Sequence, residues 1–350
     1  MNLRSVRDAN VAGKKVLVRV DCNVELNESQ DVKEKYKVAA AHHTVEYLLS
    51  QGARVALATH LGRPNGKPDD SFSVRHIVDD VERILARTVR FSESCIGDGV
   101  ESSLEDLAEG EILLLENVRF FPGDEANDPA FAQALAAPFD VFVNDAFSVC
   151  HRDQASVTGV TKFLPSFAGL HLLDEVKHLT DARERPIRPA VAIIGGAKIE
   201  TKLPIIRMFE EKYDCVLVAG KVACEAQDEH ISFSDKVLLP EDYAPERQDI
   251  GSKTLLRFRD EILKAKTVVW NGPLGKFENP EYAAGTHMTL ASIIESGAFS
   301  IVGGGETIIA LEEAGLFQKI SFVSTGGGAM LEFLSGDPLP GLLTLEDETR

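Results

Sequence analysis

The chain has 350 residues, 44% of them hydrophobic, so it can bury a large core, and its length favours two domains over one. Its formal net charge of -18 argues against a nucleic-acid or anionic-membrane partner. No apolar run approaches the roughly 18 residues of a membrane span, and the start lacks the apolar core of a signal peptide. The five cysteines are far apart and form no CxxC pair, which favours reduced thiols over a zinc site. We expect a cytoplasmic monomer.

Strands and helices alternate along the first half. An apolar run over 14–23, a helical pattern over 36–50 and a second strand over 54–60 make a βαβ unit, which predicts a parallel sheet. The alternation continues with helix 74–85, strand 89–91, helix 101–107, strand 112–116, a helix start at Asp128-Pro129 and strand 141–145. We therefore predict a doubly wound α/β domain over residues 1–167.

The second half repeats this alternation. A helical stripe over 168–182 is broken by ERPIRP, so we assign 168–189 to an interdomain helix and linker. The elements that follow are strand 190–195, helix 199–211, strands 215–219 and 237–239, helix 253–264, strand 267–270 and helix 281–295. We predict a second doubly wound, Rossmann-like parallel-sheet domain over 190–335, joined to the first by a hinge helix. Residues 336–350 are expected to form an extended strap that could return to the N-terminal domain.

Two stretches near the end share the pattern strand, glycine turn, helix. They are FSIVGGGETIIA (299–310) and ISFVSTGGGAMLEFL (320–334). Glycines leave a row of backbone N–H groups uncovered, and a helix N-terminus favours an anion, so each stretch is typical of a phosphate cradle. The alternative is that the glycines only make tight turns. Two copies in tandem suggest neighbouring strand ends that converge on one polyphosphate.

In open α/β sheets, ligands bind at the carboxyl ends of the strands. In the first half these ends carry Arg19, Asp21, Asn23, His60, Arg63, Arg119, His151 and Arg152. Arginine suits carboxylate and phosphate through its bidentate fork, so the set predicts an anion site. The alternative for each arginine is a solvated surface charge or a structural ion pair.

The strand ends of the second half carry glycines and lysines instead. Lys198 and Lys202 follow Gly195-Gly196-Ala197 and share one helical face, and Asn271-Gly272-Pro273 follows another strand. Such lysines could neutralise nucleotide phosphates or simply keep a helix soluble. No GxxxxGK[ST] motif occurs, so a Walker-type site is excluded.

No nucleophile stands with an evident general base. An acceptor that is already an anion, such as a carboxylate, needs no base, because its phosphorylation requires only positioning and charge neutralisation. An arginine-rich half and a glycine-lysine half together fit that requirement.

Eight motifs, ordered along nearly the whole chain, resemble those of the phosphoglycerate kinase family. They are VLVRVDCNV (16–24), HLGRP (60–64), ENVRF (116–120), NDAF with HR (144–152), GGAK with a second lysine (195–202), VVWNGPLGKFE (268–278), GGGET (303–307) and STGGGA (324–329). The resemblance implies reversible phosphoryl transfer between 1,3-bisphosphoglycerate and ADP, giving 3-phosphoglycerate and ATP. It also implies Mg²⁺ bound with ATP or ADP and closure of two domains about a hinge.

The resemblance also implies residue roles. The catalytic residues would be Lys198, Lys37, Gly304 and Gly327, with Lys198 at the moving phosphoryl group. Residues that would hold the glycerate are Asp21, Asn23, Lys37, His60, Leu61, Gly62, Arg63, Arg119 and Arg152. Residues that would hold the nucleotide are Lys202, Asn271, Pro273, Glu278, Gly303, Gly304, Gly305, Glu306, Thr307, Gly326, Gly327 and Gly328, with Glu306 as the magnesium ligand and Glu278 at the nucleoside.

Several positions depart from the family pattern. The family has arginine at Lys37, proline at Glu25, a second histidine at Gln154, a small apolar residue at Lys276 and often aspartate at Glu306. The second domain is also short between Gly220 and Lys236 and between Pro240 and Asp249, so the resemblance predicts the adenine contacts least well. Two competing hypotheses follow: a catalytically weakened relative that serves as a nucleotide- or acyl-phosphate-binding regulatory module, and a kinase for another acyl phosphate.

Overall fold

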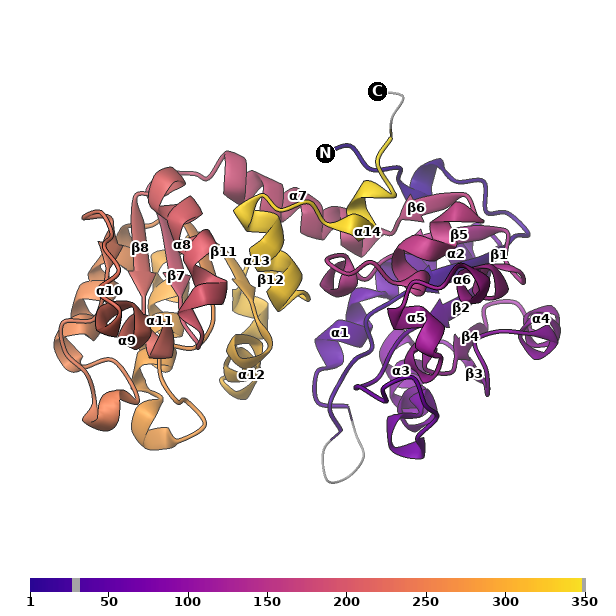
Figure 1. The fold of residues 1–350 in the computed structure, drawn as a ribbon, viewed down its shortest axis with the longest axis horizontal. Coiled ribbons are helices and arrows are strands. Elements are labelled where there is room, and N and C mark those ends of the chain that lie inside the picture. Colours follow the sequence, from indigo (N-terminus) through magenta and orange to yellow (C-terminus); the bar gives the residue numbers. More distant parts are fainter. Residues whose placement is uncertain (27–31, 348–350) are drawn as a thin grey trace. The chain divides into compact units, whose positions relative to one another are not determined.

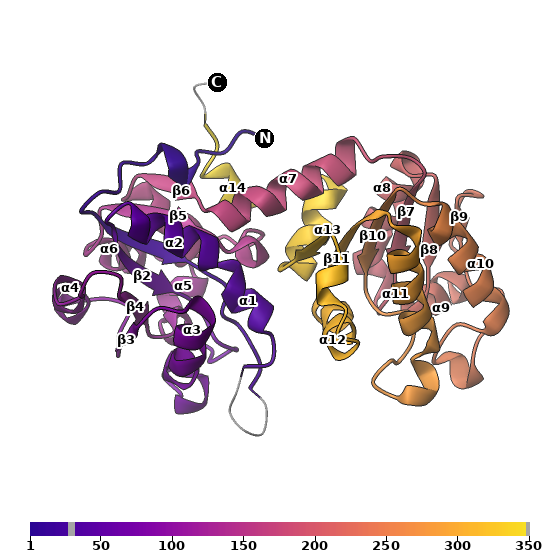
Figure 2. The ribbon, with the colours of Figure 1, turned by 180° about the vertical axis from the view of Figure 1, so that it is seen from behind.

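The computed structural model describes residues 1–26 and 32–347. These form two compact units: Met1–Glu175 with the C-terminal residues from Pro338 onward, and Val176–Asp337. The boundary falls within helix α7 (Leu170–Glu184). Each unit contains a six-stranded parallel sheet with helices on both faces (Figure 1, Figure 2). The predicted fold class, two doubly wound α/β domains, is confirmed.

The sheet of the first unit has the strand order β3-β4-β2-β1-β5-β6. Its strands are β1 (Lys15–Arg19), β2 (Arg54–Ala58), β3 (Val89–Ser92), β4 (Ile112–Leu115), β5 (Val141–Asn144) and β6 (Ser166–Ala168), and its helices are α1 (Lys35–Ala40), α2 (His42–Ser50), α3 (Val78–Leu85), α4 (Asp98–Glu105), α5 (Pro122–Glu125) and α6 (Pro129–Ala136). The order reverses direction beside β1, which places the strand ends of β1, β2 and β5 at the crevice where such sheets bind ligands.

Alternating side chains of these strands enter two different cores. Val16 and Val18 of β1 pack with α1, α2 and α3, whereas Leu17 packs with α4 and α6. Both faces are buried, so the strands read as continuous apolar runs rather than as alternating ones. The sheet is therefore a rigid support for the polar residues that follow each strand.

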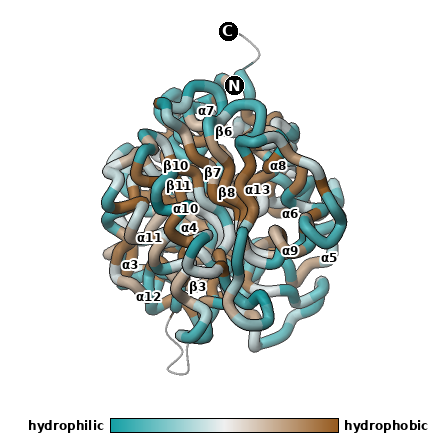
Figure 3. The backbone as a smooth tube through the Cα atoms, turned by 90° about the vertical axis from the view of Figure 1, so that its left-hand side faces the viewer, coloured by the Kyte–Doolittle hydropathy of each residue, from teal (hydrophilic) through white to brown (hydrophobic). Residues whose placement is uncertain are grey.

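The second unit has the strand order β12-β11-β10-β7-β8-β9. Its strands are β7 (Ala190–Ile194), β8 (Cys215–Val218), β9 (Val237–Leu238), β10 (Thr267–Asn271), β11 (Phe299–Gly303) and β12 (Phe322–Ser324), and its helices are α8 (Ile199–Lys212), α9 (Gly220–Asp228), α10 (Ser252–Lys264), α11 (Ala284–Ser296), α12 (Gly305–Glu313) and α13 (Gly327–Ser335). Helix α8 contacts α9 and α13, and α11 contacts α10 and α12, so two helical layers enclose the sheet. The hydrophobic colour of β7, β8 and β10 marks this enclosed layer (Figure 3).

Some predicted elements were wrong. The helix expected over 36–50 is broken at Ala41, whose N–H bonds to the Val38 carbonyl three residues back and tightens the turn. Helix α9 and strand β6 were missed. The C-terminal tail is not simply extended, because α14 (Pro340–Leu343) begins at a proline, which a first helical turn accepts. The part of that tail described ends at residue 347.

None of the helices in the described part of the chain is long and apolar enough to cross a membrane.

Candidate active site

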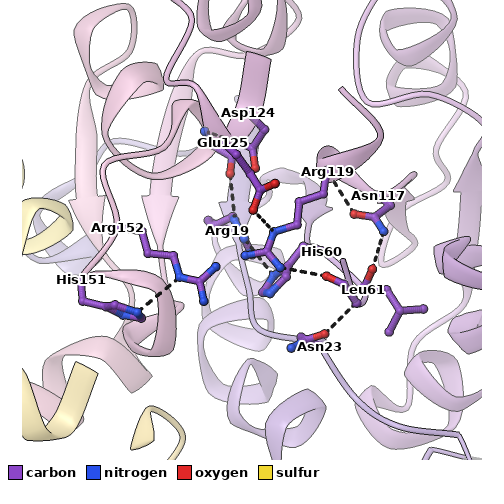
Figure 4. A network of polar contacts seen from close by, with 12 residues as sticks. Arg19, Asn23, His60, Leu61, Asn117, Arg119, Asp124, Glu125, His151 and Arg152 are labelled. Atoms are coloured by element: carbon purple, nitrogen blue, oxygen red, sulfur yellow. Dashed lines mark hydrogen bonds and ion pairs between the residues drawn. The ribbon is translucent and has the colours of Figure 1, made fainter. Parts of the chain in front are cut away.

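A cluster of basic side chains lies at the strand ends of the first unit (Figure 4). Arg19, the last residue of β1, is fully buried and donates to the Ser156 hydroxyl at 3.2 Å and to the Val20 carbonyl at 2.5 Å. Its Nη2 also lies 3.1 Å from Nδ1 of His60. Arg152 points toward the same centre, and its Nε donates to Nε2 of His151 at 3.3 Å. Positive charge is thus concentrated inside an acidic protein.

Arg119 is a buried arginine of this cluster whose charged form is disfavoured. Burial, followed by the charges of Arg152 and Arg19, lowers the pKa of Arg119 to about 10. Its Nη1 donates to the Gly62 carbonyl at 2.9 Å, and its Nε lies 3.4 Å from a Glu125 oxygen. Nε and Nη2 are nevertheless buried without a hydrogen-bond acceptor among the described residues. Arg119 therefore has buried N–H groups whose hydrogen bonds the described residues do not satisfy.

His60 is neutral in this setting. Burial and then the charges of Arg19 and Arg119 hold the pKa of His60 well below its ordinary value. A neutral imidazole can accept a hydrogen bond from Arg19 at Nδ1 and leave Nε2–H as a donor, so His60 can contact an anion without adding another repelling charge.

The loop after β1 forms a second wall. The Asn23 side-chain oxygen accepts from Gly62 N–H at 2.8 Å, and the Asn23 N–H donates to Asp21 at 2.9 Å. Lys37, from α1, donates to the Asn23 carbonyl at 2.8 Å and pairs with Glu34 at 3.3 Å. Lys37, Asn23 and Gly62 line a cavity of about 580 Å³ with Leu61.

Arg63 differs from the buried residues His60 and Leu61 that precede it. Its side chain is exposed, and among residues 1–26 and 32–347 it makes no hydrogen bond or ion pair. Sequence reasoning noted Arg19 and His151 at strand ends but did not include them in the site. It missed Asp124, whose buried carboxylate accepts from Ser156 N–H at 2.9 Å and lies near Arg19. Arg19 could have been included in the site from the sequence, because it is a charged residue at the end of an otherwise apolar strand.

The two glycine turns of the second unit meet, as the tandem pattern predicted. Strands β11 and β12 are parallel neighbours, with Gly303 opposite Ser324. A Cβ on Gly327 would lie 2.9 Å from the Gly304 Cα, and Gly304 itself has a φ of +101°. Only glycine fits this contact, so the N-termini of α12 and α13 open side by side into one cavity.

Lys202 reaches the same cavity from α8. Its ammonium donates to the side-chain oxygen of Asn271, and burial lowers the pKa of Lys202 to about 8 while Glu306 opposes that shift. Asn271 Nδ2 is buried without a partner among the described residues. Lys198 is exposed at the start of α8, where its φ is +68°. An anion here would favour the charged ammonium of Lys202.

Two cavities share one border in this unit. The first, of about 600 Å³, is the lysine-glycine cavity; its lining includes Lys198, Lys202, Asn271, Gly304, Gly305, Glu306, Thr307, Gly327 and Gly328. The second, of about 450 Å³, is lined by Gly196, Ala197, Gly220, Lys221, Cys224, Glu246, Arg247, Gln248, Pro273, Gly275, Lys276, Glu278 and Glu306. Gly196, Ala197 and Glu306 line both. Gly303 and Gly326 lie in the turns but do not line either cavity.

Sequence reasoning missed one wall of the second cavity. Gly220 and Lys221 start α9, and Cys224 lies one turn later. Glycine after a strand and before a helix was the same signal used for the other turns. Arg247 and Gln248 carried no motif that could have placed them there.

A buried arginine cluster in one α/β unit and a cavity lined by glycines and lysines in the other fit the class of two-domain phosphotransferases. Comparison with known proteins gives the family. The phosphoglycerate kinase family model matches residues 6–231 and 225–337, and the chain belongs to the phosphoglycerate kinase family. The two matched segments overlap at residues 225–231, which lie within the stretch from Gly220 to Lys236 that we expect to be abbreviated.

Individual relatives agree. The chain is 40% identical to phosphoglycerate kinase of Desulforudis audaxviator (strain MP104C) over 390 residues, covering 98% of this chain and 99% of that protein. It is also 40% identical to the enzyme of Rubrobacter xylanophilus (strain DSM 9941 / JCM 11954 / NBRC 16129 / PRD-1), covering 99% of both. The crystal structure of phosphoglycerate kinase from Pyrococcus horikoshii OT3 superposes with a TM-score of 0.86 at 27% identity, covering 98% of each chain. Nothing in these comparisons supports the regulatory-module hypothesis.

Proposed function

We propose that the basic cluster of the first unit holds the glycerate substrate and that the two cavities of the second unit hold the nucleotide. The reaction is the reversible transfer of a phosphoryl group between 1,3-bisphosphoglycerate and ADP. The observation that carries this assignment is Arg119, whose buried Nε and Nη2 have no hydrogen-bond acceptor among the described residues. Buried donors left without acceptors are costly, and a substrate phosphate or carboxylate would supply them.

The glycerate site would combine charge with shape. Arg19, Arg119 and Arg152 repel one another in the free protein, so an anion between them gains their attraction and relieves that repulsion. Neutral His60 and the Asn23 amide contribute direction without charge. We assign Asp21, Leu61 and Gly62 to the wall of this site and Lys37 to the end nearest the reacting carboxyl group. Arg63 would engage ligand from the exposed rim.

The nucleotide phosphates would lie in the lysine-glycine cavity. The uncovered backbone N–H groups after Gly304 and Gly327 start two helices there, and Lys202 supplies a positive charge. Thr307 would support the loop after β10, because the Gly272 N–H donates to the Thr307 hydroxyl at 2.8 Å. Asn271 would help to hold Lys202, whose ammonium donates to its side-chain oxygen. Lys198, exposed at the same cavity, would contact the phosphoryl group as it moves. The sugar and base would lie in the second cavity, beside Pro273 and Glu278.

The chemistry needs little from the chain beyond placement. The acceptor in one direction is the carboxylate of 3-phosphoglycerate, already an anion, and in the other it is a phosphate oxygen of ADP. Neither requires a general base, and the barrier comes from alignment and from the charge on the transferring oxygens. The arginines orient one partner, the glycine turns orient the other, and the lysines stabilise the charge.

We propose that Mg²⁺ binds with the nucleotide and that Glu306 is its protein ligand. The donor set fits, because Glu306 presents a carboxylate where the two cavities join, and Mg²⁺ takes one or two carboxylates together with phosphate oxygens. Groups of three or more His, Cys, Asp or Glu residues that could hold a metal alone are absent from the described residues. When bound, the ion would neutralise phosphate charge. We further expect a cytoplasmic monomer.

A coupled assay with ATP, Mg²⁺ and 3-phosphoglycerate tests the function. Turnover of roughly 1 to 100 per second, typical of kinases, is expected. Turnover below about one per second, with nucleotide binding intact, would favour the regulatory module.

A further inference from the structure

Arg247 occupies an unusual position in the second cavity. It lies at the tip of a hairpin in which Tyr243 and Ile250 form an antiparallel bridge, and it lines the cavity with Glu246 and Gln248. Glu246 and Arg247 have φ values of +56° and +57°, which non-glycine residues rarely adopt. Lys276 N–H donates to the Gln248 carbonyl at 2.8 Å, so the tip is attached to the opposite wall of the cavity.

The guanidinium of Arg247 is held along its edge. Nη1 donates to both carboxylate oxygens of Asp228 at 2.9 and 3.1 Å, and Nη2 donates to the Gln227 side-chain oxygen at 3.0 Å. Asp228 and Gln227 both belong to the last turn of α9. The plane of the guanidinium is therefore fixed before any ligand binds.

Tyr243 covers one face of that plane. The Arg247 Cζ lies 4.9 Å from the centre of the Tyr243 ring, and the Tyr243 hydroxyl donates to the same Gln227 oxygen at 2.6 Å. The Arg247 side chain is still 37% exposed. With its edge occupied and one face covered, the surface it can offer to the cavity is the second face.

We propose that Arg247 is a base-binding residue of this site: the base of the nucleotide stacks on the free face of its guanidinium, in a sandwich of tyrosine, arginine and base. This inference rests on the proposed function, since the phosphates must occupy the adjoining lysine-glycine cavity. A planar, delocalised cation stacks on the face of an aromatic base and tolerates different bases, because every base has a π-face. The chain should therefore bind ADP and GDP with similar affinity.

The test is equilibrium binding of three ligands, ADP, GDP and ribose 5-diphosphate, to the full chain. Arg247→Ala should weaken ADP and GDP about tenfold, the size of one base-stacking contact, and leave ribose 5-diphosphate unchanged. Arg247→Lys should be nearly as weak, because it keeps the charge and loses the plane. Asp228→Asn, which frees the guanidinium, should give a smaller loss with the same pattern. Arg259→Ala is the matched control, since Arg259 pairs with Glu295 at 3.0 Å and does not line the cavity.

The outcomes separate the possibilities. Equal weakening of ADP and ribose 5-diphosphate by Arg247→Ala would overturn the stacking proposal, as would full binding of ADP by Arg247→Lys. A tenfold or greater preference of the parent for ADP over GDP would also contradict it. If the parent protein binds neither ADP nor ribose 5-diphosphate, the proposed function itself is overturned, and this inference with it.

Discussion

Gly327 packs against Gly304 so closely that a Cβ on Gly327 would come within 2.9 Å of the Gly304 Cα. The contact joins two loops that follow different strands, and it sets how near the N-termini of α12 and α13 can lie. Because the Gly304 Cα is a backbone atom, it cannot move aside as the end of a flexible side chain would. The lysine-glycine cavity thus depends on the absence of two side chains.

Gly327→Ala should separate the two turns. We expect a loss of roughly 1–3 kcal/mol in stability from overpacking and a clear rise in the KM for ADP. Gly99→Ala, in α4 of the first unit, is the control, because a Cβ there has nothing within 4 Å, alanine favours the helix, and Gly99 does not line the cavity. Thermal unfolding and steady-state kinetics on both variants decide the matter: equal effects would mean that the contact does not shape the site.

Arg152 should be a residue that function requires and stability does not. Its charge lowers the pKa of Arg119 and of His60, which means that it repels a protonated neighbour. Arg152→Ala should leave the free protein as stable or up to about 1 kcal/mol more stable, while it weakens 3-phosphoglycerate roughly tenfold to a hundredfold. Unfolding curves with and without 3-phosphoglycerate measure both. A marked loss of stability without ligand would identify Arg152 as structural.

Lys37 presents a point charge where the family resemblance implies an arginine. Its ammonium is shared between the Asn23 carbonyl and Glu34, so it can grip a carboxylate less firmly than a fork. Lys37→Arg should raise turnover by about fivefold to thirtyfold, corresponding to roughly 1–2 kcal/mol, and Lys37→Ala should be worse than either. An alanine variant with the activity of the parent would place Lys37 outside the site.

Glu306→Gln tests the magnesium assignment. The variant keeps the size of the side chain and removes the charge that a hard cation prefers. It should weaken MgADP by an order of magnitude or more and leave metal-free ADP nearly unchanged. Calorimetry with and without Mg²⁺ gives both constants, and equal changes in the two would contradict the assignment.

Lys202 is predicted to take up a proton when nucleotide binds beside it. Burial lowers its pKa from the ordinary 10.5 to about 8, so between these values the unfolded chain holds a proton that the folded chain has lost. The free energy of unfolding should therefore gain a contribution as pH rises from about 8 toward 10.5, and the penalty of the buried charge is fully present below about 8. Bound phosphates favour the ammonium, so ADP binding near pH 8.5 should take up a proton.

Calorimetric titration of ADP in two buffers of different ionisation enthalpy measures that proton. Lys202→Met should abolish the uptake. Uptake that persists in this variant would assign the proton to another group.

The sequence was sufficient to predict the α/β class, because buried parallel strands leave continuous apolar runs and helices leave a 3.6-residue period. It also predicted that the turns around Gly304 and Gly327 converge, since tandem units in a parallel sheet end at one edge. Interruptions within a helix were harder to predict. No residue type near Ala41 indicates that the helix tightens into a turn there.

Side chains placed by long-range contacts could not be predicted in the same way. Arg247 reaches the second cavity only because a hairpin carries it to the end of α9, where Asp228 holds it. The exposed side chain of Arg63 could not be predicted for a related reason: a position beside Gly62 fixes the backbone but not the direction of a long side chain.

A crossed binding measurement tests the central claim, that the two units hold different substrates. Binding of 3-phosphoglycerate and of ADP is measured separately for Arg119→Ala and for Lys202→Met. The account predicts that Arg119→Ala weakens 3-phosphoglycerate about tenfold to a hundredfold and spares ADP, whereas Lys202→Met weakens ADP and spares 3-phosphoglycerate. Loss of both ligands in either variant, with the fold intact, would contradict it.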